Sequence, residues 1–397
     1  MRINVHHVMR AAACSALALS LASAGLAPVA AADKAPVKVG LVTSKTGLLG
    51  AYGNEFLRGF KVGLDYATHG TGMAGGHKLE VSDFDDGGDA QKAIATTKDL
   101  IGQGYKIIAG TVWSGIAVQI APLAQENNIL YMPLAATDAL TGVNRNTVRV
   151  GRESIQDLLT IGTILGTNLR GKRILVLAQD SAFGQANVAG ARLVLGGEGA
   201  TVDGLLVPLS ANDFTPFAQK VVDAKPDLLF IAWAGASGVA LMQSLANAGV
   251  LDSTKVVTGL DQRAAFPLFA KYSKIQYISL YTPECSHTAP NEFLISSDKK
   301  DLGKMPEDFE NDGFVAAQMI VHAVATADGD DVSKMISALG GYKFIGPKGM
   351  EQVRAADHAL LEPMFVAALK SEGSNVYPVC LRTLPPGAVA PPVHPFH

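Results

Sequence analysis

The stretch KVGLVTSKTGLLGAYGNEFLRGFKVGLDYA at residues 38–67 decides the fold. Two elements are predicted in and around this stretch. The first is a buried strand formed by the apolar run 37–43, which ends before the turn around Gly47. The second, 55–68, has apolar side chains at helical spacing on one face, namely Phe56, Phe60, Leu64 and Ala67. A strand, a glycine-containing loop and an amphipathic helix in this order form the first part of a βα unit.

The same alternation of short apolar runs and helical patterns continues in two series. The second series begins after Val148 with a helix expected at 155–169 and a strand at 173–178. That strand has no polar alternation, as a strand covered on both faces should. Regular βα alternation in two series predicts an α/β protein with two doubly wound, Rossmann-like lobes. The rhythm then changes to a long helix at 309–327, a shorter one at 332–340 and a strand near 363–369.

The composition narrows the class of protein. The chain has 397 residues, of which 48% are hydrophobic and 17% charged, with 33 Lys and Arg against 36 Asp and Glu. It is too apolar for a disordered chain, and its length suits two lobes better than one domain. A net charge of −3 gives no general attraction to phosphate backbones, so no nucleic-acid partner is expected.

Residues 1–32 have the pattern of a secretory signal peptide. Arg2 and Arg10 give a basic start without any acid, 11–27 is apolar, and Ala residues at 30–32 provide a small-residue cleavage site. A membrane anchor is the alternative, which the Ala, Ser and Gly content of the run disfavours. The mature chain is therefore expected to begin after about Ala32 and to be exported to the periplasm.

Two motifs resemble cofactor or metal sites but lack the required context. Gly70, Gly72 and Gly75 match G-x-G-x-x-G, yet a helix precedes them and a strand follows, which is the reverse of a dinucleotide site. The acids at 83–89 lack the closing Glu of a calcium loop, and a strand end followed by a helix cap at Asp89 is expected instead. No cofactor and no metal are expected.

The sequence also shows no complete catalytic motif and offers at most one disulfide after residue 32. Ser114 has no local His or Asp and no G-x-S-x-G context, so the chain is not expected to be an enzyme. An exported hydrolase that uses Ser114 is an alternative, and it requires a His and an acid from distant loops. Cys285 and Cys380 are the only cysteines after residue 32, and both a single disulfide and two free thiols are open.

In doubly wound sheets, ligands bind at the carboxyl ends of the strands, where loops and helix N-termini present unpaired N–H groups. We therefore expect a binding site among loops that are rich in polar and aromatic side chains. These loops are 44–53, 111–115, 135–141, 180–184, 233–238 and 259–263.

Five segments, in order along the chain, carry a family resemblance. They are the stretch at 38–67, LEVSDFDDGGDAQKAIATTKDLI at 79–101, GTVWSGIAVQIAPLAQENNILYMPLAATDALT at 110–141, DSAFG at 180–184 and DFTPFAQKVVDAKPDLLFIAWAGASGVALMQSLANAG at 213–249. Together they resemble the exported solute-binding proteins of ABC importers, in the branched-chain amino acid (Leu/Ile/Val-binding) family. Each segment is a weak signal alone, whereas five in order are specific.

The resemblance implies a type I periplasmic-binding-protein fold, in which two lobes joined by a three-crossover hinge close on a small solute. The expected division is residues 33–150 with about 283–341 for the first lobe, 151–282 with about 342–382 for the second, and a Pro-rich, irregular tail at 383–397.

The resemblance also implies the site residues. Ser114 matches the Ser that grips the ligand carboxylate, with backbone N–H groups near Gly115, and Ala136 and Thr137 match the A-T pair that completes this polar pocket. Hydroxyls and helix-start amides suit a carboxylate without an Arg. Tyr52 and Phe183 match aromatic wall positions.

The second-lobe loops decide the ligand class. Asp261 falls where amino-acid binders carry an acid that pairs with the ligand ammonium, although it could instead cap its loop or pair with Arg263. Trp233 stands in a loop where these binders show Gly and Tyr, and Trp113 adds bulk beside Ser114. The three aromatics Trp113, Phe183 and Trp233 favour a planar ligand, or else they pack within the lobes.

The sequence thus predicts the periplasmic substrate-binding subunit of an ABC importer, a monomer that captures a small carboxylate and delivers it to a membrane permease. Asp261 favours an amino acid, branched-chain or other, as the ligand. An aromatic carboxylate is the competing ligand, and a ligand-sensing receptor module is the competing role.

Overall fold

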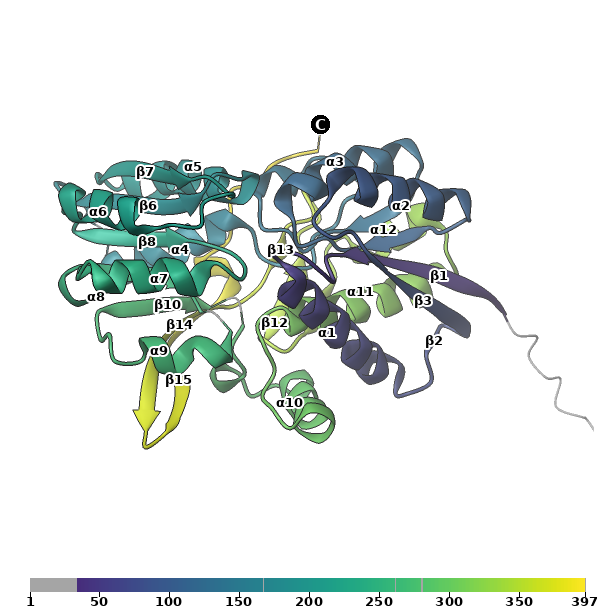
Figure 1. The fold of residues 1–397 in the computed structure, drawn as a ribbon. Helices are drawn as coiled ribbons and strands as arrows, with labels where there is room; N and C mark the ends of the chain where they lie inside the picture. Colours follow the sequence, from purple (N-terminus) through teal and green to yellow (C-terminus); the bar gives the residue numbers. More distant parts are fainter. Residues whose placement is uncertain (1–33, 167, 261, 280, 397) are drawn as a thin grey trace, which may run out of the picture. The chain divides into compact units, whose positions relative to one another are not determined.

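The computed structural model describes residues 34–396 except 167, 261 and 280 (Figure 1). The predicted signal peptide, residues 1–32, lies outside these residues, as does Asp261. Within the described part of the chain, no helix is both long and apolar enough to cross a bilayer.

The first sheet has the strand order β2-β3-β1-β4-β5, and β1, β4 and β5 run parallel to one another. Helices α1, α11 and α12 pack on one face through one core cluster, while α2 and α3 pack on the other through a second. We call this sheet and its five helices the first lobe. Its strands are β1 (Lys34–Thr43), β2 (Met73–Ala74), β3 (His77–Asp85), β4 (Ile107–Ala109) and β5 (Leu130–Met132), and its helices are α1 (Gly50–Thr68), α2 (Ala90–Gly102), α3 (Ser114–Glu126), α11 (Glu310–Ala327) and α12 (Val332–Leu339).

Helices α1 and α11 are distant in sequence but pack closely through glycines. A Cβ atom at Gly59 would overlap the Glu310 carbonyl, and one at Gly313 would overlap the Phe56 carbonyl. Absence of Cβ atoms lets the two backbones approach to direct contact. The return segment that carries α11 is thereby fixed beside the start of the chain.

The second sheet has the order β15-β14-β10-β9-β8-β6-β7, parallel except for β14 and β15. Helices α4 and α5 cover one face, and α6–α9 cover the other. We call this sheet and these helices the second lobe (Figure 1). Its strands are β6 (Arg173–Gln179), β7 (Thr201–Val207), β8 (Leu228–Ala232), β9 (Lys255–Gly259), β10 (Ile275–Ser279), β14 (Met364–Glu372) and β15 (Asn375–Leu384), and its helices are α4 (Ser154–Leu165), α5 (Ala182–Gly197), α6 (Thr215–Ala224), α7 (Gly238–Asn247), α8 (Val250–Ser253) and α9 (Phe266–Phe269).

The predicted fold class is confirmed, because both sheets are doubly wound and the chain passes between them three times. The crossings follow β5, β10 and β13. The helix expected at 155–169 ends earlier, at Leu165, because Gly166 adopts a φ of 87°. The elements that were not predicted include β2, α8, α9 and β15, together with α10 (Ala289–Leu302) and the small sheet of β11 (Lys343–Ile345), β12 (Met350–Val353) and β13 (Leu360–Leu361).

The division into lobes remains a prediction, but one of its boundaries conflicts with the core packing. Phe344, Val353 and Leu360 belong to the core cluster of the first lobe. Residues 343–361 therefore pack with the first lobe, whereas the sequence analysis placed 342–382 in the second. We now place the last crossing between β13 and β14.

Two further expectations are settled by the structure. The acids at 83–89 do form a strand end and a helix cap, since the Asp89 side chain accepts hydrogen bonds from the Gln91 and Lys92 amides at the start of α2. Cys285 and Cys380 form a disulfide with a Cα–Cα distance of 5.2 Å, which joins the turn after β10 to β15.

The C-terminal tail begins later than expected, because β15 continues to Leu384. Among the described residues that follow it, up to 396, the short 3₁₀ turn Pro386–Ala388 is the only regular element. Two side chains from 354–357 hold the end of the tail: Arg354 donates to the Pro391 carbonyl at 2.7 Å, and Asp357 accepts from the His394 amide at 3.0 Å.

Candidate functional site

A cavity of about 140 Å³ is lined by residues that follow the carboxyl ends of β4, β5, β6, β8 and β9, together with crossing segments. This is the position where ligands bind in open α/β sheets. Those of its lining residues that bear on ligand binding are Leu49, Tyr52, Val112, Trp113, Ser114, Gly115, Leu134 and Ala136 from the first lobe, Gln179, Ser181, Phe183, Trp233, Gly235, Thr258 and Gln262 from the second, and Arg152, Asp157, Asp308 and Phe309 from segments at the crossings.

Ser114 and Gly115 form a polar end of the cavity at the start of α3. Ser114 is the first residue of this 13-residue helix and is 4% exposed, and no side chain caps the helix. The first N–H groups of an uncapped helix carry a partial positive charge and lack backbone acceptors. With the Ser114 hydroxyl beside them, these groups can donate to a carboxylate.

The A-T pair that the sequence analysis placed in the pocket is only partly there. Ala136 lines the cavity, and its carbonyl accepts from the Ser154 amide at 2.7 Å. Thr137 is not among the lining residues, and its carbonyl accepts a hydrogen bond from Arg149 at 2.9 Å. A contact between Thr137 and a ligand stays a prediction.

Aromatic side chains form much of the remaining wall. Tyr52 stacks on Phe309 with ring centroids 4.4 Å apart. Trp233 packs edge-on against Phe214, and its Nε1 donates to Ser237 at 3.1 Å. Trp113 and Phe183 complete this wall from the two lobes. Packing of Tyr52 on Phe309 and of Trp233 on Phe214 holds two of these rings in place, and together the four aromatic side chains make much of the wall apolar.

The rim of the cavity joins the two lobes directly. The Tyr52 hydroxyl accepts from the Gly235 amide at 2.9 Å, and the Leu48 carbonyl accepts from the Ala236 amide at 3.3 Å. Beside them, Gln262 donates to Glu55 at 2.6 Å. Burial raises the pKa of Glu55 to about 7, although the bond from Gln262 lowers it. These contacts connect the start of α1 with loops that follow β8 and β9.

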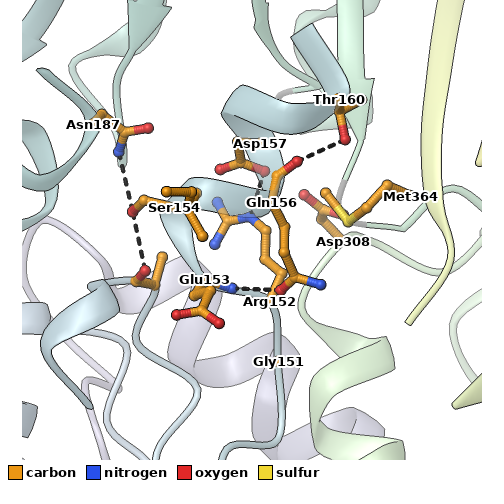
Figure 2. A network of polar contacts seen from close by, with 12 residues as sticks. Gly151, Arg152, Glu153, Ser154, Gln156, Asp157, Thr160, Asn187, Asp308 and Met364 are labelled. Carbon is orange, nitrogen blue, oxygen red and sulfur yellow. Dashed lines mark hydrogen bonds and ion pairs between the residues drawn. The ribbon is translucent and has the colours of Figure 1, made fainter. Parts of the chain in front are cut away.

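Two charged residues reach the cavity near the start of α4: Arg152 lies just before this helix and Asp157 lies in its first turn (Figure 2). The Arg152 Nε lies 3.0 Å from Asp157 Oδ1, and both side chains are nearly buried. Burial raises the pKa of Asp157 to about 6, while Arg152 lowers it. A third polar group, Asp308, accepts from the Tyr281 amide at 2.6 Å, and burial holds its pKa well above the usual range.

Of the nine residues expected to bind ligand, the structure brings seven to one cavity: Tyr52, Trp113, Ser114, Gly115, Ala136, Phe183 and Trp233. Thr137 is not with them, and Asp261 lies outside the described residues. Their contacts with a ligand stay predictions. No His is among the described residues that line the cavity, so the hydrolase alternative has no histidine base beside Ser114 there.

Sequence reasoning missed Arg152, Asp157, Asp308 and Phe309. None of them follows a parallel strand directly, so the rule that located the loops could not find them. The available signal was the run VRVGRES at 148–154, in which two arginines and a glutamate stand among apolar and small residues at the start of a helix.

A family model described as periplasmic binding protein matches residues 36–374. The chain is 26% identical over 240 residues to the Leu/Ile/Val-binding protein BraC3 of Rhizobium johnstonii, which covers 58% of this chain and 64% of that protein. It is 22% identical over 350 residues to Leu/Ile/Val-binding protein homolog 6 of Brucella melitensis, covering 84% and 89%. The chain thus matches less than two thirds of the length of BraC3.

Two solved structures are similar to this chain over most of its length. A crystal structure of an ABC-type branched-chain amino acid transporter from Rhodopseudomonas palustris has a TM-score of 0.75 at 29% identity, covering 90% of this chain and 99% of that one. An ABC transporter solute binding protein from Rhodopseudomonas palustris BisB5, solved with 3,4-dihydroxybenzoic acid, has a TM-score of 0.77 at 22% identity, covering 88% and 97%. The second likeness concerns the fold.

Proposed function

The chain belongs to the periplasmic binding protein family, and from this premise we propose that it is the substrate-binding subunit of an ABC importer. In this role it captures one small carboxylate between its lobes in the periplasm and presents it, as a monomer, to a membrane permease. The observation that carries the proposal is the cavity at the carboxyl ends of both sheets, with an uncapped helix start at Ser114 on its wall.

The polar end of the cavity supports a carboxylate as the recognised group. The Ser114 hydroxyl and the first N–H groups of α3 are donors, and charge-assisted hydrogen bonds to a carboxylate are about twice as strong as neutral ones. Burial of this end strengthens them further, because water does not screen them.

The size and walls of the cavity support a compact apolar body. A volume of about 140 Å³ is close to the roughly 150 Å³ of an apolar protein cavity that binds benzene. Both a branched aliphatic side chain and a single aromatic ring fit this description. Trp113, Phe183 and Trp233 favour the ring, whereas Asp261, if it pairs with an ammonium, favours the amino acid.

The rim contacts support closure of the lobes around the ligand. The bonds of Tyr52 to Gly235 and of Gln262 to Glu55 join the two lobes beside the cavity. In hinge-type binding proteins such contacts form as the lobes close and shield the charged end of the ligand from water. The closed form is the one that we expect the permease to recognise.

The test is a thermal-shift screen of the mature protein against leucine, isoleucine, valine, 4-hydroxybenzoate, dicarboxylates and amides. At 100 times Kd a ligand adds about 2.7 kcal/mol to the free energy of unfolding, which gives a clear shift in Tm. We expect at least one monocarboxylate to give this shift. The same screen without any shift from a carboxylate would contradict the proposal.

A matched pair of variants locates the site. Ser114→Ala removes a hydroxyl in the first turn of α3, and Ser333→Ala removes one in the first turn of α12, where the side chain is exposed and outside the cavity. We expect Ser114→Ala to weaken binding of the hit about ten-fold, which corresponds to one charge-assisted hydrogen bond. Ser333→Ala should leave the affinity unchanged.

A further inference from the structure

We propose that Arg152 makes the cavity select a carboxylate over the matching neutral amide, by donating from its two terminal nitrogens to the bound carboxylate. The inference rests on the proposed function, and it adds an anchor that neither the fold nor the motif at Ser114 supplies. Arg152 is thereby a specificity-determining residue for the captured ligand.

The contacts of Arg152 leave most of its donors unused. Its side chain is 11% exposed and lines the cavity, and its Nε makes an ion-pair contact with Asp157. Figure 2 shows this Nε edge turned to the Asp157 carboxylate. Among the described residues, neither Nη1 nor Nη2 has a hydrogen-bond partner, and both retain accessible surface. A nearly buried guanidinium with four free N–H bonds is unusual, because buried donors are normally paired.

The backbone of Arg152 is held rigidly before any ligand arrives. Its carbonyl accepts from the buried Arg149 at 2.8 Å. Two residues later, α4 begins with a capping box formed by Glu153 and Gln156. The Ser154 amide then bonds to the carbonyl of Ala136, which itself lines the cavity. Binding groups that are fixed in this way lose little entropy when they engage a ligand.

The charges around Arg152 allow it to receive an anion. Two described acids line the cavity, and Asp157 pairs with the Nε edge of Arg152. Asp308 is the other, and burial raises the pKa of its carboxyl well above the usual range. A ligand carboxylate at the terminal nitrogens therefore lies near one acid that is already in an ion pair and one acid whose burial favours the protonated form.

The chemistry of the guanidinium explains why the amide is disfavoured. A carboxylate offers two acceptor oxygens and a full charge to the paired N–H groups of Arg152. The corresponding amide offers one acceptor oxygen. Its NH₂ group is a donor, so it cannot accept a hydrogen bond from the N–H groups of Arg152. The alternative is that Arg152 only neutralises Asp157, in which case acids and amides have no reason to respond differently to its removal.

The test uses leucine with leucinamide and 4-hydroxybenzoate with 4-hydroxybenzamide, titrated by calorimetry into wild-type protein, Arg152→Met, Asp157→Asn and the double variant Arg152→Met/Asp157→Asn. The double variant removes both charges, so that no acid is left buried without its partner. Arg58→Met is the matched control, since Arg58 is similarly buried in ion pairs with Asp298 and Asp301 but does not line the cavity.

In wild-type protein and in Arg58→Met we expect an acid to bind at least ten-fold tighter than its amide. In Arg152→Met and the double variant the acid should lose ten- to a hundred-fold in affinity, while the amide changes less than three-fold. Asp157→Asn should keep the preference for the acid. Equal losses for acid and amide, or no loss at all, would overturn the role of Arg152 and leave the proposed function intact. Failure of both acids to bind wild-type protein would overturn both.

Discussion

Two arginines, three residues apart in the same crossing segment, have opposite environments. Arg149 is 1% exposed, and its guanidinium donates to the carbonyls of Ala135, Thr137 and Arg152 at 2.7–2.9 Å. Arg152 lines the cavity and has one ion-pair contact, to Asp157. Carbonyls of the protein accept hydrogen bonds from the Arg149 guanidinium, whereas the terminal nitrogens of Arg152 have no hydrogen-bond partner among the described residues.

The difference shows that an arginine with a structural role is recognised by the hydrogen bonds that its N–H groups make within the protein, and less by its burial. An arginine that binds ligand leaves such N–H groups without a protein partner. Both residues are arginines and both are nearly buried, so neither the residue type nor the burial distinguishes them. Arg149 crosslinks the loop after β5 to the start of α4 and fixes the backbone on which Arg152 sits. The predictions below test whether the two roles can be separated.

The largest effect is expected from Arg149→Met. This change removes the donor to the carbonyls of Ala135, Thr137, Gly151 and Arg152 and should reduce the free energy of unfolding by about 3–5 kcal/mol. Urea denaturation followed by circular dichroism measures the loss. If Arg149→Met costs no more than Arg152→Met, the assignment of the structural role to Arg149 is wrong.

Removing the disulfide should destabilise the protein without altering selectivity. Cys285 and Cys380 are separated by 95 residues, and closing so long a loop is worth about 2–4 kcal/mol. The variant Cys285→Ser/Cys380→Ser should lose about this much in urea denaturation. Its ratio of acid to amide affinity should equal that of wild-type protein. A changed ratio would show that a loss of stability alone can alter the preference for the acid.

The stability cost of Arg152→Met should be smaller and should depend on pH. The change leaves Asp157 buried without its ion pair and should cost about 1–3 kcal/mol at pH 8. Loss of Arg152 also raises the pKa of Asp157 further, so the carboxyl is protonated at pH 5.5 and the cost there is lower. Denaturation at the two pH values measures the difference, and an Asp157→Asn change in the same chain should abolish it.

The wild-type protein itself should lose stability as pH rises above about 5. Burial raises the folded-state pKa of Glu153 to about 7 and of Asp157 to about 6, above the 4–4.5 of unfolded chains. The native state therefore binds more protons than the unfolded state in this window, and stability is lost as each group ionises. We expect a loss of about 1–2 kcal/mol per group between pH 5.5 and 8.

Single variants measure how much of this pH dependence comes from each of the two regions. Glu153→Gln acts beside Arg149 and Asp157→Asn beside Arg152, and each should flatten part of the profile of Tm against pH. A flat wild-type profile over pH 5.5–8 would contradict the raised pKa values.

Much of the fold was predictable because its signals are local. Apolar runs and helical spacing located both βα series, and the position of Ser114 followed from a strand, a short loop and a helix in order. The hairpin of β14 and β15 was missed, because β15 is largely exposed and alternates weakly. The helix end at Gly166 was missed because glycine also occurs inside helices of this chain, as at Gly59.

The missed part of the site depends on how the crossings are arranged. Arg149 and Arg152 look alike in the run VRVGRES, and only the path of the loop after β5 decides which of them meets carbonyls and which meets the cavity. The path of the same loop also decides that Thr137 does not line the cavity and that its carbonyl accepts from Arg149. Asp308 and Phe309 reach the cavity from the second crossing, about 200 residues from Ser114. Such long-range placement has no signature in a single sequence.

The most direct test of the account is a calorimetric titration of the wild-type protein with leucine and 4-hydroxybenzoate, each beside its primary amide. We predict that one of the two acids binds with one site per chain and at least ten-fold tighter than its amide. Binding of neither acid, or equal binding of acid and amide, would contradict the claim that this cavity captures a small carboxylate.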